Sequence, residues 1–161
     1  MIFTIEAIFL TVLFTLIIVP NVIRNPIKWI FDYPQAIQDK ALALGLIKKE
    51  EQTKSIRTLF IKLGAIVFFA LVIALVLRYV NGLVTFKDAF ITGYLLFNIV
   101  NWYDALILDC IWFCHSKKII IPGTEGMKEY KDYWYHIRGG FIGMAIGIVV
   151  CALAAGIVIL L

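Results

Sequence analysis

The chain has 161 residues, of which 62% are hydrophobic and 16% are charged. A soluble domain is usually about half apolar and about one-quarter charged, so this composition argues against an ordinary soluble protein. The formal charge of +4 indicates no nucleic-acid partner, because the basic residues gather beside long apolar runs. These runs predict an all-α, polytopic membrane protein whose partner is the lipid bilayer.

Four apolar runs predict four transmembrane helices in one bundle. They cover residues 2–19, 59–80, 86–115 and 139–161. The first run stops at Pro20 and lacks the basic start and cleavage site of a signal peptide, so we expect it to be retained. Thr85 with Asp88 three residues later predicts a capped start for the third helix. A single integral membrane domain, 1–161, is expected.

The positions of Lys and Arg predict the orientation of this bundle. Seven of them lie between the first two spans, and five lie in or beside the segment between the last two. Short loops rich in basic residues remain on the cytoplasmic side. We therefore expect the loops 20–58 and 116–138 to be cytoplasmic and both termini to lie outside.

The first cytoplasmic loop contains a predicted amphipathic helix that begins near Pro34 and ends at Gly45, with Asp32 as its cap. Its apolar face would consist of Ile37, Ala41 and Leu44, and its polar face of Gln38, Asp39 and Lys40. Aromatic residues before this helix suit the headgroup region and predict an interfacial position. A helix that packs on the protein is the alternative.

Small residues recur at every fourth position of the fourth span. They are Gly139, Gly143, Gly147, Cys151 and Ala155. On a helix they form one stripe where a second backbone can approach closely. We expect this stripe to pack against another helix of the same chain. A homo-oligomer through the fourth helix is the alternative.

The third span carries polar residues that membrane helices normally avoid. At about 100° per residue, they fall within an arc of about 140°. They are Tyr94, Asn98, Asn101, Asp104, Asp109, Trp112 and His115. Ionisable residues at such depths cost at least a few kcal/mol each and usually mark a ligand site or a relay. The arc is expected to run from the bilayer midplane to the cytoplasmic side.

The two aspartates differ in their expected partners. Lys62 in the second span lies at about the depth of Asp109, so a structural Lys62–Asp109 ion pair is one interpretation. A functional role for Asp109 is the other. No other span offers a comparable partner for Asp104, which makes Asp104 the strongest candidate for a functional residue.

These observations predict a polar, acidic cavity in the cytoplasmic half that binds, and in one interpretation modifies, a lipid-like or amphiphilic molecule. The candidate catalytic residues are Asp104, Asp109 and His115. The candidate ligand-binding residues are Asn98, Asn101, Trp112, His136 and Arg138. Asp109, His115 and His136 form a candidate site for a divalent metal ion, although their spacing matches no established zinc or di-iron pattern.

Two alternatives from other classes remain open. One is an oligomeric ion or solute channel, or a transporter, lined by the third helix. The other is an accessory subunit of a larger membrane complex. The chain contains no Walker loop, GxGxxG, HExxH, CxxC or GxSxG motif, so nucleotide hydrolysis, thiol–disulfide exchange and serine hydrolysis are poorly supported.

Overall fold

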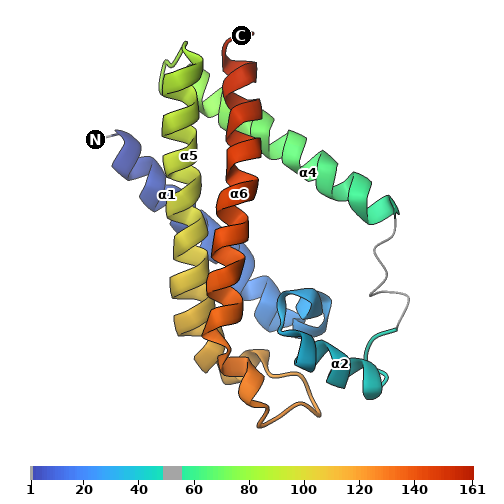
Figure 1. Ribbon diagram of the computed structural model, residues 1–161. Coiled ribbons are helices and arrows are strands. Elements are labelled where there is room, and N and C mark those ends of the chain that lie inside the picture. Colours follow the sequence, from blue (N-terminus) through green and yellow to red (C-terminus); the bar gives the residue numbers. More distant parts are fainter. Residues whose placement is uncertain (1, 49–55) are drawn as a thin grey trace. The chain divides into compact units, whose positions relative to one another are not determined.

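The computed structural model describes residues 2–48 and 56–161, apart from several side chains between residues 56 and 65. Every regular element in these ranges is helical (Figure 1). The α-helices are α1 (Ile2–Arg24), α2 (Gln35–Ala43), α4 (Ile56–Leu75), α5 (Phe86–Tyr103) and α6 (Tyr133–Val158). A π-helix, Val76–Val80, follows α4, and a second one, Asp104–Trp112, follows α5. The predicted all-α class is confirmed for the described residues.

Three helices are long and apolar enough to cross a membrane. They are Ile2–Arg24, the continuous helical segment Phe86–His115, and Tyr133–Val158. These correspond to the first, third and fourth predicted spans. The second predicted span covers residues 59–80. Within it, the described apolar helix is Ile66–Val80, which is shorter than the length needed to cross a membrane. The described residues thus provide three candidate membrane-spanning helices.

The apolar run of the first predicted span stops at Pro20, but helix α1 continues past it to Arg24. A proline inside a helix removes one backbone hydrogen bond, and helices of membrane proteins tolerate this where side chains supply other bonds. Here the Asn21 side chain donates to the carbonyl of Ile17 at 2.6 Å. The added bond helps to hold the helix together beside the proline.

The starts of the other two long candidate spans follow from their caps. The N–H of Asp88 donates to the Thr85 hydroxyl at 3.2 Å, which confirms the predicted cap of α5. Helix α6 begins at Tyr133 rather than at residue 139. The reason is that the Asp132 carboxylate accepts the N–H of Tyr135 at 3.0 Å and caps this earlier turn.

The chain divides into two compact units. Of the described residues, the first contains 2–9, 56–101 and 141–161, and the second contains 10–48 and 102–140. Helices α1, α5 and α6 contribute residues to both units. Each unit has a buried apolar core of its own.

The core of the first unit combines alanines of α4, α5 and α6 with the larger side chains of Leu77, Val150 and Val158. Its buried members include Ala70, Ala74, Ala89, Ala154 and Ala155. A Cβ atom at Gly147 would lie 2.6 Å from the ring of Phe97, and one at Gly143 would overlap the amide of Asn101. Figure 1 shows α5 and α6 side by side. The absence of side chains at these glycines allows that close approach.

The predicted small-residue stripe matches this contact in part. Cys151 and Ala155 are fully buried. Gly139 is different, because a Cβ atom there would meet nothing within 4 Å in the described structure. Gly140, one residue later and in the second unit, would instead bring a Cβ atom to 3.1 Å from Trp102. The stripe is therefore occupied by packing within the chain, with Gly140 in place of Gly139.

The core of the second unit joins the two loops that the sequence predicts on the cytoplasmic side. Its buried residues are Val22, Ile30, Tyr33, Ile37, Ala41, Ile47, Phe113, Ile119, Ile121 and Tyr130. The Tyr33 hydroxyl donates to the carbonyl of Ile119, and the Tyr130 hydroxyl accepts the N–H of Ile121, both at 2.9 Å. These bonds satisfy polar groups that would otherwise be unpaired inside an apolar core.

Helix α2 differs from its predicted pattern in two positions. Ile37 and Ala41 are fully buried as expected, but Leu44 remains 44% exposed. Gln38, predicted on the polar face, is buried, because its side chain donates to the carbonyl of Tyr33 at 2.7 Å. The apolar face of α2 is thus covered by protein in this unit.

The ends of α2 follow the predicted positions, but not the predicted cap. The helix starts after Pro34 with no side-chain cap, and Asp32 instead ends the preceding 3-10 helix, Pro26–Asp32. Proline fixes its own φ and favours the first turn of a helix, so it can start α2 without a carboxylate cap. Gly45 has a φ of 71°, the left-handed conformation that commonly ends helices, as predicted.

The packing of α6 against α5 predicts a difference between two matched glycine substitutions. We expect Gly147→Ala to lower the free energy of unfolding by about 1–3 kcal/mol, because the new methyl group overpacks against Phe97. Gly139→Ala adds the same methyl group in open space and should be neutral or slightly stabilising. Thermal unfolding in detergent measures both, and equal effects would contradict the packing.

The core of the second unit predicts the effect of removing the hydroxyl group of Tyr33. Tyr33→Phe should lower the free energy of unfolding by about 1–3 kcal/mol, because it leaves the buried carbonyl of Ile119 without its donor. Tyr79→Phe removes a hydroxyl from a side chain that is 70% exposed and should have little effect. An equal loss of stability in the two variants, measured by denaturant unfolding, would contradict this assignment.

The same tyrosine predicts an alkaline transition. Burial raises the pKa of Tyr33 above its ordinary value, and the charges of Tyr130 and Asp32 act in the same direction. The unfolded chain therefore loses this proton first, so the stability that Tyr33 provides falls as pH rises above about 10. Tyr33→Phe should show a smaller decline in stability between neutral pH and pH about 11 than the unmodified chain.

Candidate functional site

The two aspartates of the third predicted span lie in the π-helix Asp104–Trp112. At the α-helical angle, residues five apart would lie about 140° apart around the axis. A π-helix bonds each residue to the fifth one along, so it brings such a pair toward the same side, and π-helical turns occur frequently at functional sites. Asp104 and Asp109 are such a pair.

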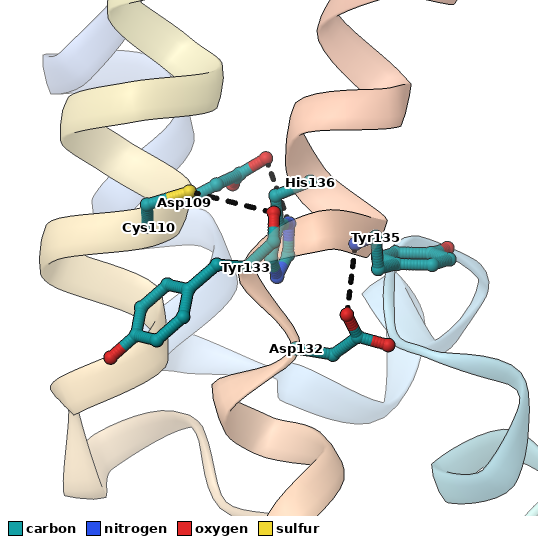
Figure 2. Close-up of polar contacts among 6 residues, drawn as sticks. All are labelled: Asp109, Cys110, Asp132, Tyr133, Tyr135 and His136. Atoms are coloured by element: carbon teal, nitrogen blue, oxygen red, sulfur yellow. Dashed lines mark hydrogen bonds and ion pairs between the residues drawn. The ribbon is translucent and has the colours of Figure 1, made fainter.

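Asp109 is paired with a histidine from the first turn of α6. The Asp109 Oδ2 atom lies 3.0 Å from Nδ1 of His136. Figure 2 shows the carboxylate directed toward the imidazole ring across the gap between the two helices. The Asp109 side chain keeps 32% of its surface exposed. A carboxylate that holds one ring nitrogen of a histidine fixes the orientation and the tautomer of that ring.

The second ring nitrogen of His136 has no such partner. His136 is only 4% exposed, and its Nε2 atom is buried without a hydrogen-bond partner among the described residues. The rings of Phe113 and Tyr135 pack edge-on against the imidazole, with centroid distances of 5.2 and 5.3 Å. A neutral imidazole that donates through Nδ1 to a carboxylate has a basic lone pair on Nε2. In that tautomer Nε2 is a buried acceptor with no hydrogen-bond partner among the described residues.

Asp104 differs from the other acidic residues of the three candidate spans. Glu6 accepts hydrogen bonds from Asn81 at 3.0 and 3.1 Å, Asp88 accepts one from Thr85, and Asp109 pairs with His136. No hydrogen bond or ion pair to Asp104 occurs within the described ranges. A carboxylate in a membrane helix normally finds such a partner, so Asp104 is the exception among these acidic residues.

The remaining predicted residues near the loops lie apart from this pair. His115 is exposed, with Nδ1 2.9 Å from the carbonyl of Ile111 and Nε2 3.3 Å from the hydroxyl of Tyr133. Both of its nitrogens therefore have partners. Trp112 packs against the apolar core of the second unit, and Arg138 is exposed on α6.

The two predicted asparagines lie in the first unit. The side chain of Asn98 donates to the carbonyl of Tyr94 at 2.8 Å, whereas its Oδ1 atom is buried without a hydrogen-bond partner in the described structure. The amide of Asn101 lies against Gly143. The structure thus assigns Asn101 a packing contact with α6 and leaves one acceptor on Asn98 unused.

The predicted metal site gains no support from the described residues. Among them, no three His, Cys, Asp or Glu side chains gather in a way that would hold a metal ion. A pair of His and Asp is too small a ligand set for a structural zinc site, which uses four ligands. The predicted Lys62–Asp109 pair lies outside the described residues, because the side chain of Lys62 is not described.

Comparisons with models of protein families, with curated proteins and with solved structures gave no match. The assignment of a site therefore depends on the geometry of these side chains alone.

Sequence reasoning missed two features of the site. It placed Asp104 and Asp109 at opposite edges of a polar arc, because it assumed α-helical geometry up to His115. It grouped Asp109 with both histidines, whereas the structure brings only His136 to Asp109. The heptapeptide from Asp132 to Arg138 could have indicated this, because Asp132 is a good helix cap that places His136 in the first turn of α6.

The contrast between the two aspartates predicts different effects on stability. Asp109→Ala should lower the free energy of unfolding by about 1–3 kcal/mol, because it leaves the buried His136 with no partner at either nitrogen. Asp104→Ala removes a carboxylate that bonds to none of the described residues and should be neutral or stabilising. Thermal unfolding of the two variants in one detergent measures the difference, and a larger loss for Asp104→Ala would contradict the assignment.

Proposed function

We propose that this chain is an integral membrane protein that binds an amphiphilic, lipid-like molecule, that Asp104 and Asp109 hold the polar end of this ligand, and that His136 orients Asp109. The observation that carries the proposal is the Asp109–His136 pair beside an unpartnered Asp104 within a candidate membrane span. A charged carboxylate near the centre of a bilayer costs about 2.5–3.5 kcal/mol on the insertion scale. A bound ligand that hydrogen-bonds to Asp104 would offset that cost.

The chemistry of the site indicates the kind of ligand. As carboxylates, both oxygens of Asp104 and the second oxygen of Asp109 are acceptors. The ligand must therefore supply donors, such as hydroxyl or ammonium groups. Asp109, whose side chain is 32% exposed and is oriented by His136, is the group that could accept a proton from a ligand hydroxyl, which is the step that a modifying enzyme would require.

The proposed topology retains four spans. In this topology α4 with its π-helical end forms the second span, both termini face outward, and both loops face the cytoplasm. The support is the distribution of basic residues between the runs. The core of the second unit, around Tyr33 and Ile119, supports a position of both loops on the same side of the membrane, because residues of both loops are buried in it. Helix α2 would lie at the membrane interface, with its polar face directed away from the protein core.

The test begins with protein extracted from its native membrane. Native mass spectrometry and lipid analysis should detect an amphiphile with hydroxyl or amino groups that copurifies with the unmodified chain. Asp104→Asn should reduce the bound amount by about tenfold or more, because an amide replaces one strong charge-assisted bond. After the amphiphile has been removed from both proteins, the thermal stability of Asp104→Asn should equal that of the unmodified chain.

Asp39→Asn is the matched control, because Asp39 is exposed on α2 and outside the candidate spans. It should retain the ligand. Equal retention by Asp104→Asn would contradict the proposal. Ion or solute flux through proteoliposomes, lost in Asp104→Asn without any bound amphiphile, would instead favour the channel class.

A further inference from the structure

A polar pocket lies in the second unit where α1 ends. It has a volume of about 330 Å³ and is lined by Asn21, Arg24, Asn25, Lys28 and Trp29. Asn21 and Arg24 belong to the last turn of α1, Asn25 caps the next element, and Lys28 and Trp29 belong to the 3-10 helix Pro26–Asp32. The sharp change of direction at Asn25 and Pro26 therefore brings two cationic side chains to one concave surface.

The side chains that line this pocket carry positive charge only. Within the described part of the chain, neither Arg24 nor Lys28 forms an ion pair, and no acidic residue lines the pocket. The C-terminal end of α1 contributes a partial negative charge of about one-half unit, which two full positive charges outweigh. The pocket is therefore a site that favours an anion.

The hydrogen-bonding groups in the pocket are mainly donors. Arg24 offers five N–H groups and Lys28 offers three. The Asn25 Oδ1 atom already accepts the backbone N–H of Lys28 at 3.4 Å, which leaves the amide nitrogen of Asn25 as a donor. Anions with several oxygens, above all phosphate, match such an arrangement, because each oxygen can accept more than one bond.

The size and position of the pocket restrict the anion further. A volume of about 330 Å³ is at the lower limit of small-molecule sites, which suits a phosphate ester rather than a large ligand. The pocket lies at the end of a candidate membrane span, with an aromatic residue, Trp29, in its wall. Basic and aromatic side chains at such an end are typical contacts of phospholipid headgroups.

We propose that the pocket formed by Asn21, Arg24, Asn25, Lys28 and Trp29 binds a phosphate group, carried either by a lipid headgroup or by a small soluble phosphate ester. Arg24 and Lys28 hold the phosphate oxygens, and the Asn25 amide adds a neutral donor. This site shares no residue with Asp104, Asp109 and His136, and it favours the opposite charge. The two sites can therefore be tested separately.

The experiment compares two lipids that differ only in the phosphate. Phosphatidic acid and diacylglycerol with the same acyl chains are titrated into the detergent-solubilised full chain, and bound lipid is counted by native mass spectrometry. The double variant Arg24→Gln, Lys28→Gln should bind phosphatidic acid about tenfold more weakly, or worse, because two charge-assisted contacts are lost. Binding of diacylglycerol should be weak and unaffected.

A matched control removes the same total charge elsewhere. Lys40→Gln, Lys117→Gln changes two exposed lysines that do not line the pocket. It should alter phosphatidic acid binding less than twofold. An equal loss in both double variants would show that lipid binding depends only on net charge and would overturn the proposal. Full retention by the pocket variant would also overturn it.

A second arm identifies the source of the phosphate. Inorganic phosphate and glycerol phosphate are titrated against the tryptophan fluorescence of the chain, with Trp29→Phe to show that the signal comes from the pocket. Pocket-dependent binding of these soluble probes supports the proposal with a soluble phosphate ester as ligand. Pocket-dependent binding of phosphatidic acid without binding of the soluble phosphates supports the proposal with a membrane lipid as ligand. If neither phosphatidic acid nor the soluble phosphates bind to the pocket, the proposal is wrong.

Discussion

The close approach of α6 to α5 is the constraint on which the candidate site depends. Lipid provides no hydrophobic drive for helix association, so contact has to come from backbones that pack tightly. In the second unit, Gly140 lies against Trp102 and Ala105, with Cβ distances of 3.1 and 3.2 Å for a hypothetical methyl group. His136 lies one turn earlier on the same helix and reaches Asp109 at 3.0 Å. A bulky residue at Gly140 would separate the acid from the histidine.

The polar groups of the site differ in whether another residue of the chain forms a hydrogen bond or ion pair with them. Asp109 and His136 satisfy each other through one atom each. Asp104 has no partner in the described ranges, and the second nitrogen of His136 is buried without one. Sequences depart from local rules mostly at functional sites, where stability is given up for binding or chemistry. The π-helix, which is rare and contains both aspartates five residues apart, is a second such departure.

The sequence predicts the helices well, because apolar length and capping residues are local signals. Thr85 and Asp88 start α5 as expected, and the glycines of α6 pack as expected apart from Gly139. The predictions that failed did so because contacts outside the local sequence pattern decided the structure. Gln38 is buried because it finds the carbonyl of Tyr33, which no local pattern reveals. The π-helix likewise leaves no residue signature, so the angular relation of Asp104 to Asp109 was not predictable.

The most direct test of the account is an experimental density map of the chain in nanodiscs made from its native membrane. The account predicts non-protein density within hydrogen-bond distance of the Asp104 carboxylate, extended as an acyl chain would be. It also predicts that Asp109 remains paired with His136. A map in which a protein side chain, for example Lys62, is bonded to Asp104 and no ligand density lies beside it would contradict the account.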